Sequence, residues 1–446
     1  MASFRDLYKN DVDFAALSLQ SKDFAQYLKP NGQLDFNDSN AVRQLTISLL
    51  KQDFGLDVKL PEDRLCPPVP NRLNYILWLH DIVESTSKTS NIAEDTGKKV
   101  VGLDLGTGCC SIYPLLGCKT RSSWEFLATD IDENNTRTAQ ENVKRNQLES
   151  RIRVIKTDPK DDLFPLDKLE QKSLDFTMCN PPFYTSREEM AQSSESKSQQ
   201  PSSVCTGADV EMVTKGGEVA FVTKMIDESL NLRDRIQWYT SMLGKLSSVS
   251  VLVEALIKHG NHNYAVTEFV QGSKTKRWAL AWSWGDRRPS MSVARGIPGF
   301  PKHLLPFPAD YNFTLPSEIS IDNATKSIDK ELESLRWFWK WDQSRSAGVG
   351  FAAENVWSRQ ARRKQMKLAG QDGSSSKVDS VPDEVALGVR VVAKLVRDQS
   401  GSSNENEVQI VIHWIQGMDS VLFESFCGML KRKLESSKPH EAEKIG

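Results

Sequence analysis

The sequence predicts an α/β protein built on a mostly parallel, doubly wound sheet, and two observations support this prediction. From Lys99 onward, short apolar segments typical of strands alternate with longer amphipathic segments typical of helices. Polar residues and glycines follow the ends of several predicted strands, where open parallel sheets bind their ligands. The chain of 446 residues also has room for a second, smaller domain.

The elements of the predicted sheet follow one another in a regular order. The first four strands are predicted at 99–106, 124–130, 151–158 and 174–180. Helices are predicted from Cys110 and at 133–147, 216–230 and 247–260. A further strand at 235–244 and a closing hairpin of strands at 264–272 and 276–284 complete the pattern. Strand–helix–strand spacing implies parallel pairing up to the hairpin.

The rest of the chain reads as appendages to this core. Residues 1–69 are predicted to form a helical N-terminal segment, and the main domain spans 70–285 with an amphipathic helix from Arg72 to Val83. Residues 286–305 are rich in Pro, Arg and Gly and are predicted to be a linker. Residues 306–437 are predicted to be a small α+β domain with a disordered loop at about 369–383.

Within this small domain, the sequence predicts one helix in "NATKSIDKELESLRWFWKW", residues 323–341. Two strands at 384–396 and 407–415 and a final helix at 419–435 follow. Elsewhere in the chain, a Ser/Gln-rich stretch at 191–204 is typical of a mobile loop.

Composition excludes several classes of protein. The formal net charge of −2 does not indicate a general nucleic-acid binder, so any basic surface has to be local. No apolar run approaches the roughly 20 residues that span a bilayer, and the N-terminus has no apolar signal core. Seven cysteines without a C-x-x-C pair favour reduced thiols in the cytosol or nucleus. His259 and His262 lack further ligands nearby in sequence, so no metal site is expected.

A cluster of candidate ligand-binding residues lies where the predicted strands end. The first strand ends in Asp104, Gly106 and Gly108 of "DLGTG", and such a turn lets a ligand approach the backbone. This motif alone is also compatible with NAD binding or with a structural turn. Asp130 ends the second strand about 20 residues later, where an acid can accept hydrogen bonds from ribose hydroxyls. The third strand leads to a polar segment that includes Asp161.

The fourth strand ends in "NPPFY", Asn180 to Tyr184. Together with the glycine loop and the closing hairpin, this motif resembles the class I (Rossmann-like) S-adenosylmethionine-dependent methyltransferases over roughly residues 70–285. The resemblance implies a mostly parallel seven-stranded sheet with an antiparallel last strand. Within that superfamily, N-P-P-[FYW] implies methylation of a planar nitrogen, either the exocyclic amine of a base or a glutamine amide.

The chemistry of such a nitrogen explains the motif. Its lone pair is delocalised, so it reacts only when it is held with the lone pair toward the methyl donor. The Asn180 side-chain oxygen and the Pro181 carbonyl can each accept a hydrogen bond from one N–H of the amine. Pro181 and Pro182 stiffen the backbone. Phe183, or alternatively Tyr184, can stack on a flipped base. No catalytic His or Asp is required, because the methylated ammonium is acidic enough to lose a proton to water.

A closer resemblance covers the first 285 residues. Blocks such as "CPPVPNRLNYILW", "GLDLGTGCCSIYPLLG", "MCNPPF" and "KGGEVAFVTKMI" resemble the eukaryotic U6 small nuclear RNA adenosine methyltransferases. This resemblance implies the cofactor S-adenosylmethionine, an RNA partner and a nuclear location, with a cytoplasmic pool also allowed. It also implies that the N-terminal segment, residues 1–69, binds RNA. It assigns Arg72 to the methionine carboxylate, Gly106 and Asp130 to the cofactor, and Asp161 to a position near its adenine. From the sequence alone, Arg72 reads as a solvated helix start.

Two alternatives stay open. A protein glutamine methyltransferase would also use this type of motif, although the family blocks and the C-terminal module argue against it. A non-catalytic, methyltransferase-like RNA-binding protein is the second, and the intact glycine loop and Asn180 argue against it.

The C-terminal region resembles the RNA-binding C-terminal region of the same family. Its basic stretch at 359–367 is either a phosphate-binding surface or a solvated helix face. Its "RWFWKW" is read as core more readily than as a base-stacking surface.

Overall fold

The computed structural model describes residues 4–87, 99–186, 189, 208–271, 275–361, 363, 378–397 and 406–436. The predicted loop at 191–204 and most of the spacer at 369–383 lie outside these residues. The chain divides into two compact units. The first comprises Met1–Val83, Asp95–Gly285 and Val293–Leu305, and the second comprises Glu84–Glu94, Asp286–Ser292 and Pro306–Gly446.

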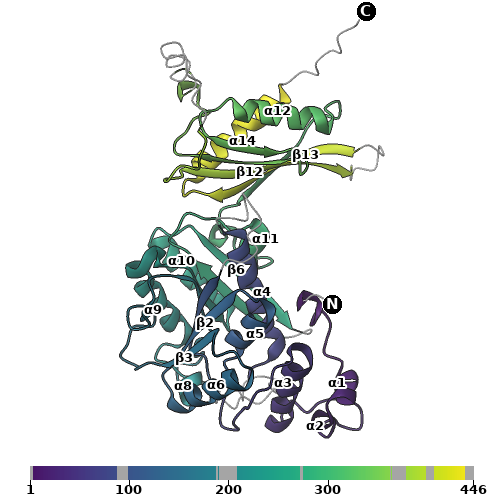
Figure 1. The fold of residues 1–446 in the computed structure, drawn as a ribbon, viewed down its shortest axis with the longest axis vertical. Helices are drawn as coiled ribbons and strands as arrows, with labels where there is room; N and C mark the ends of the chain where they lie inside the picture. Colours follow the sequence, from purple (N-terminus) through teal and green to yellow (C-terminus); the bar gives the residue numbers. More distant parts are fainter. Residues whose placement is uncertain are drawn as a thin grey trace, which may run out of the picture. The chain divides into compact units, whose positions relative to one another are not determined.

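The first unit is built on an eight-stranded sheet of order β3-β2-β1-β4-β5-β7-β6-β8 (Figure 1). Its strands are β1 (Val100–Leu105), β2 (Trp124–Asp130), β3 (Ile152–Lys156), β4 (Leu174–Cys179), β5 (Ile236–Leu243), β6 (Tyr264–Gln271), β7 (Thr275–Trp282) and β8 (Arg295–Gly296). Strands β1 to β5 pair in parallel, whereas β7 is antiparallel to both of its neighbours. The predicted Rossmann-like sheet with an antiparallel strand is therefore confirmed. The two-residue β8, parallel to β6, is an addition.

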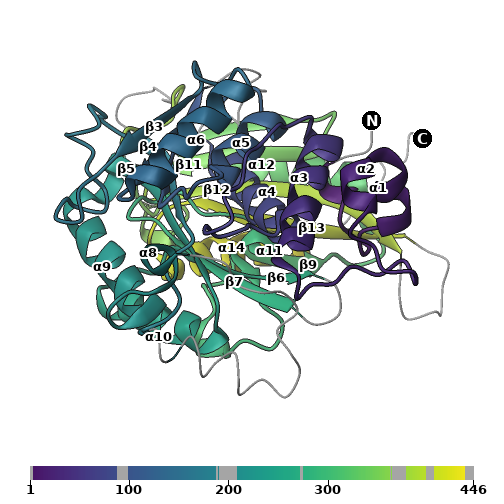
Figure 2. The ribbon, with the colours of Figure 1, turned by 90° about the horizontal axis from the view of Figure 1, so that it is seen from below.

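Helices cover both faces of this sheet, which explains why its strands are apolar on both sides. One core contains α3 (Ser39–Phe54), α4 (Val69–Ser85), α5 (Ile112–Thr120) and part of α6 (Glu133–Arg145). The other core contains α9 (Gly217–Leu232) and α10 (Leu246–Lys258). The short α1 (Phe14–Gln20) and α2 (Lys22–Ala25) pack beside α3, as Figure 2 shows from below. No helix among the described residues is long and apolar enough to cross a membrane.

The second unit is a five-stranded antiparallel sheet of order β10-β11-β12-β13-β9, with two helices packed on one face. The strands are β9 (Asp310–Thr314), β10 (Phe338–Asp342), β11 (Ala347–Ala352), β12 (Leu387–Arg397) and β13 (Asn406–Gln416). The helices are α12 (Ile321–Glu333) and α14 (Ser420–Glu435). The predicted strands at 384–396 and 407–415 and the final helix agree with β12, β13 and α14.

The predicted helix at 323–341 is wrong in its second half. Helix α12 ends at Glu333, and strand β10 follows. The reason is a period of two, because Trp337, Trp339 and Trp341 share one face of the strand. Their rings form a stacked ladder, with centroids 5.5 Å and then 6.0 Å apart. The ladder lies over the glycines of β11, where a Cβ at Gly348 would come within 2.5 Å of the Trp339 ring.

The segment at 286–305, predicted as a linker, is divided between the two units. Ile297, Phe300 and Leu304 are buried in the core of the first unit, next to strand β8. Arg288 belongs to the second unit, where its Nε donates to the Gly417 carbonyl at 3.0 Å. The short α11 (Met291–Ala294) lies between these two parts of the segment.

Candidate active site

The glycine loop after β1 is held by backbone hydrogen bonds to the neighbouring strand. Gly106 and Gly108 have φ values of 72° and 63°, in the left-handed region that glycine adopts without strain. The N–H groups of Gly106 and Thr107 both donate to the Thr129 carbonyl at 2.9 Å. The Gly108 N–H donates to Asp130 Oδ2, also at 2.9 Å. The loop and the end of β2 thus form one rigid edge.

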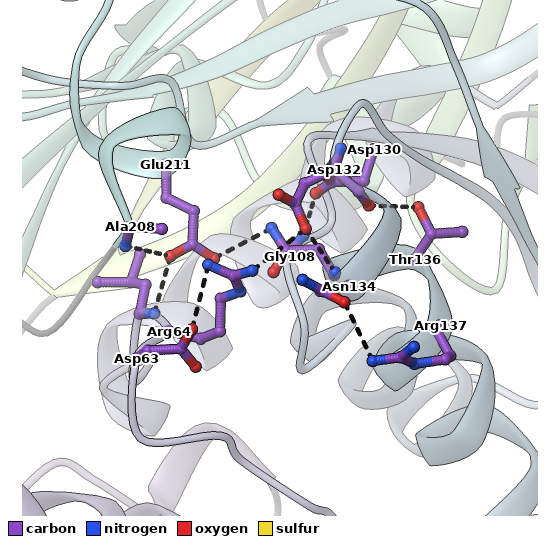
Figure 3. A network of polar contacts seen from close by, with 12 residues as sticks. Asp63, Arg64, Gly108, Asp130, Asp132, Asn134, Thr136, Arg137, Ala208 and Glu211 are labelled. Atoms are coloured by element: carbon purple, nitrogen blue, oxygen red, sulfur yellow. Dashed lines mark hydrogen bonds and ion pairs between the residues drawn. The ribbon is translucent and has the colours of Figure 1, made fainter.

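Asp130 is buried at this edge, with 7% of its surface exposed. Its Oδ1 accepts the Asp132 N–H at 2.9 Å, and Figure 3 shows both carboxylate contacts. Burial raises the pKa of Asp130, while its backbone hydrogen bonds lower that pKa. Each carboxylate oxygen keeps a second lone pair, so Asp130 can still accept from the hydroxyls of a ribose.

Asp104, at the end of β1, is fully buried. Neither of its carboxylate oxygens has a hydrogen-bond partner of good geometry in the part of the chain that the structure describes. Burial raises the pKa of Asp104 to about 7, whereas the nearby Thr107 hydroxyl and the charge of Arg72 act in the opposite direction. A buried acid in this condition suits a ligand that brings positive charge or hydrogen-bond donors.

Arg72 lies in the first turn of α4 and is 5% exposed, so it is not the solvated residue that the sequence alone favours. Its Nη1 donates to Met242 Sδ at 3.1 Å, and its Cζ lies 5.5 Å from the centre of the Tyr113 ring. Its Nε has no hydrogen-bond partner among the described residues. Because a buried cation is costly without an anion, Arg72 fits the carboxylate of a ligand.

Asn180 follows β4 directly, and its Oδ1 is buried without a hydrogen-bond partner among the described residues. Pro181 is buried and Pro182 is partly buried next to it. Most buried acceptors in proteins are paired, so an orphan amide oxygen at the end of a strand indicates a missing donor. An amine held at this position would supply it.

The ring of Phe183 packs closely against Gly244. A Cβ on Gly244 would lie 3.1 Å from Cδ1 of the ring. Glu218 fixes the turn around Gly244, because it accepts the Gly244 N–H at 2.6 Å and the Ser248 hydroxyl at 2.5 Å. On another side, Arg277 Cζ lies 5.9 Å from the ring centre. The position of Phe183 is therefore set by a small residue.

Tyr184 and Asp161, two further candidates, are engaged locally. The Tyr184 backbone forms an isolated bridge to Val213, donating to the Met212 carbonyl at 3.0 Å. The Asp161 carboxylate accepts from Lys168 Nζ at 2.5 Å and from the Asp158 N–H at 2.7 Å. The hydrogen bond from Lys168 lowers the pKa of Asp161. In contrast to Asp104, the Asp161 carboxylate has protein donors already.

Figure 3 shows two residues near the glycine loop that the sequence did not suggest. Glu211, in α8 (Asp209–Met212), approaches Gly108, where an added Cβ would lie 3.8 Å from Glu211 Oε1. Arg64 reaches Asp132 Oδ1 at 3.4 Å. Neither residue belongs to a recognisable short motif, since each has partners that lie far away in the sequence. Among the described residues, no cluster of His, Cys, Asp or Glu could hold a metal ion.

The site as a whole fits S-adenosylmethionine. The methionine carboxylate of the cofactor matches the unsatisfied Arg72, and the ribose of the cofactor matches Asp130. The positive charges of the cofactor match the buried Asp104. Most of the expected ligand residues thus lie at the carboxyl ends of β1, β2 and β4, and Arg72 reaches the same region from α4. Asp161, which follows β3, is engaged with Lys168 instead.

Comparison with known proteins identifies the same chemistry. Residues 2–286 match a family model described as RNA methyltransferase. The chain is 36% identical over 411 residues to the U6 small nuclear RNA (adenine-(43)-N(6))-methyltransferase of Schizosaccharomyces pombe, covering 92% of this chain and 97% of that protein. It is 34% identical to the RNA N(6)-adenosine-methyltransferase mettl16 of Danio rerio, covering 96% of each.

Solved structures agree with this assignment. The catalytic domain of hMettl16 in complex with the MAT2A 3'UTR hairpin 1 superposes with a TM-score of 0.56 and 40% identity, covering 64% of this chain and 95% of that chain. The N-terminal domain of human METTL16 in complex with SAH superposes with a TM-score of 0.52 and 37% identity, covering 64% and 99%. The expected enzyme class and cofactor are confirmed. This chain belongs to the RNA methyltransferase family and is an S-adenosylmethionine-dependent methyltransferase.

Proposed function

We propose that this enzyme methylates the exocyclic N6 of an adenosine in structured RNA, with U6 small nuclear RNA as its first substrate. The observation that carries the proposal is the buried, unpartnered Oδ1 of Asn180 beside two prolines and Phe183. The relatives that cover most of the chain, from Schizosaccharomyces pombe and Danio rerio, are named for adenine N6 methylation.

The cofactor supplies an activated methyl group, and the residues of the chain bind and orient the adenine. Asn180 Oδ1 and the Pro181 carbonyl each accept a hydrogen bond from one N–H of the amine, which holds the nitrogen with its lone pair directed at the methyl group. Phe183 stacks on the base at a distance set by Gly244. Arg72 holds the cofactor carboxylate and Asp130 holds its ribose, so that the two reactants meet in one geometry.

The test is methyl transfer from labelled S-adenosylmethionine, followed by nucleoside analysis. U6 small nuclear RNA should yield N6-methyladenosine. The same RNA with the target adenosine replaced by guanosine should take up no label. Label in a glutamine-containing protein but not in RNA would favour the glutamine methyltransferase. Tight binding of RNA and cofactor without any transfer would favour the non-catalytic protein.

We further propose that the second unit contributes to RNA affinity through phosphate contacts. Strand register places Lys340, Arg390 and His413 in one row across the sheet, with Asp310 at its end and Lys394 nearby. This row lies on the face opposite the helices, because the buried residues of the alternate positions pack on α12 and α14. Most of the basic stretch at 359–367 lies outside the described residues.

The full chain carrying Lys340→Glu and Lys394→Glu tests this second proposal. RNA binding should weaken and depend less steeply on salt, by about one unit of slope for each lost phosphate contact. Lys330→Glu, an exposed change on α12, is the matched control. Unchanged affinity and salt dependence in the double variant would contradict an RNA-binding role for this face. In every variant, SAH binding should stay unchanged.

A further inference from the structure

We propose that Glu211 is a positioning residue that ties the segment next to the substrate to the cofactor loop. The inference rests on the proposed function, because that function places the substrate next to Asn180 and Phe183. Glu211 itself does not touch the reacting atoms. Its effect is exerted through the segments that it holds together.

The first set of contacts fixes Glu211 to the segments that flank the cofactor loop. Its Oε2 accepts the Leu65 N–H and the Ala208 N–H, both at 2.9 Å, and its Oε1 accepts Asn135 Nδ2 at 3.2 Å. Leu65 precedes α4, which carries Arg72. Asn135 lies in the first turn of α6, three residues after Asp132, the residue that caps this helix. Figure 3 shows the carboxylate of Glu211 facing Gly108 across this network.

The second set of contacts ties the same short segment to the substrate side. Next to Glu211, the Met212 carbonyl accepts the Tyr184 N–H at 3.0 Å. The Tyr184 carbonyl in turn accepts the Thr214 N–H at 2.9 Å. Residues 211–214 therefore bridge the segment that carries Asn180 and Phe183 to the chain before α4 and to α6. The carboxylate of this bridge lies beside the cofactor loop, where a Cβ added at Gly108 would be 3.8 Å from Glu211 Oε1.

A carboxylate is well suited to this tie. One group accepts three donors, two of them from segments far apart in the sequence, and hydrogen bonds to an ionised acceptor are stronger than neutral ones. Burial raises the pKa of Glu211, and the hydrogen bonds from the Leu65 and Ala208 N–H groups lower it. Of the nearby charges, Arg64 lowers this pKa and Asp130 raises it. A purely structural carboxylate would stabilise the fold without affecting the cofactor site. The two roles therefore differ in a measurable way.

The test uses the full chain with Glu211→Ala and Glu211→Gln. Calorimetry with SAH should give a dissociation constant raised about tenfold in Glu211→Ala. Glu211→Gln should recover a large part of this loss, because its amide oxygen can still accept from Leu65 and Ala208. Its amide nitrogen can donate to the otherwise unpartnered Asn135 Oδ1 once the Asn135 amide turns over. In steady-state kinetics, KM for S-adenosylmethionine should rise and kcat should fall in Glu211→Ala, while RNA affinity stays within about twofold.

Glu228→Ala is the matched control. Its carboxylate also holds a loop N–H, that of Phe164 at 3.2 Å, in the same unit but on α9. This variant should lose thermal stability and keep the SAH affinity. If Glu211→Ala is folded and binds SAH as the wild type does, the proposal is overturned.

A measurement on the wild type keeps the proposal testable if Glu211→Ala fails to fold. SAH should slow amide hydrogen exchange in residues 208–214 and at Tyr184 as well as in the glycine loop. Protection confined to the glycine loop would overturn the tie. Failure of the wild type to methylate RNA would instead contradict the proposed function, and the SAH measurements would still decide the role of Glu211.

Discussion

Removal of the Asn180 side-chain oxygen is the most direct perturbation of the proposed chemistry. In Asn180→Ala, the amine of the target base loses one of two acceptors that are already oriented in the folded protein. This acceptor is buried and has no protein donor among the described residues, so a small rearrangement of the site would not restore the lost hydrogen bond. Deleting a preorganised hydrogen bond of this kind costs roughly 3–4 kcal/mol in the transition state, which corresponds to a loss of about 10² to 10³ in turnover.

The assay is single-turnover methyl transfer to U6 small nuclear RNA with saturating enzyme and cofactor, so that chemistry is separated from product release. Affinities for RNA and SAH should change little, because the lost interaction matters mainly in the transition state. Thr177→Val provides a matched control on the same strand. The Thr177 hydroxyl is also buried and unpartnered among the described residues, so its removal should leave turnover intact. Turnover of Asn180→Ala within about threefold of the wild type would refute the role of Asn180.

Three further predictions concern the same unit. Asp130→Ala should weaken SAH binding by roughly 1.5–3 kcal/mol in calorimetry if the carboxylate binds the ribose, and an unchanged dissociation constant would make Asp130 a purely structural anchor of Gly108. Gly244→Ala should push the Phe183 ring, raising KM for RNA with unchanged SAH affinity, and equal rises in both would point to general unfolding instead. The pKa of Asp104 is raised to about 7 in the folded protein, so the folded state binds more protons than the unfolded chain between about pH 4 and 7. The free energy of unfolding therefore falls as pH rises through that window, by about 4 kcal/mol in total. Asp104→Asn should remove that part of the pH dependence in thermal unfolding, and an unaltered dependence would show that another group causes it.

The main sheet could be predicted because its signals are local. Each strand is a short apolar run that ends in a polar residue or a glycine, and each helix has its own period. The burial of Arg72 could not be predicted in this way, since the first turn of a helix is often solvated. Only the packing of α4 against β5 and Tyr113 makes Arg72 a buried cation. The role of Glu211 was missed for the same reason, because all but one of its contacts are to distant segments.

One error arose where local signals compete, and one segment differs from what its composition suggests. Trp337 to Trp341 follow a helical segment closely, and the run of aromatic residues hid the change of period from 3.6 to 2. The segment at 286–305 has the Pro, Arg and Gly content of a linker, yet Phe300 and its apolar neighbours are buried and Arg288 binds a distant carbonyl. Composition reports average exposure, whereas burial depends on a few apolar residues at the right spacing.

The tryptophan ladder of β10 has a spectroscopic consequence. The centres of the Trp337 and Trp339 rings lie 5.5 Å apart, and the ring planes are 5° from parallel. At this distance the electronic transitions of the two rings couple. The resulting circular dichroism couplet would come from the second unit and would disappear when β10 separates from β11, because the ladder rests on the two glycines of that strand. A single optical signal would thus report the integrity of the second unit in the full chain, while SAH binding reports that of the first.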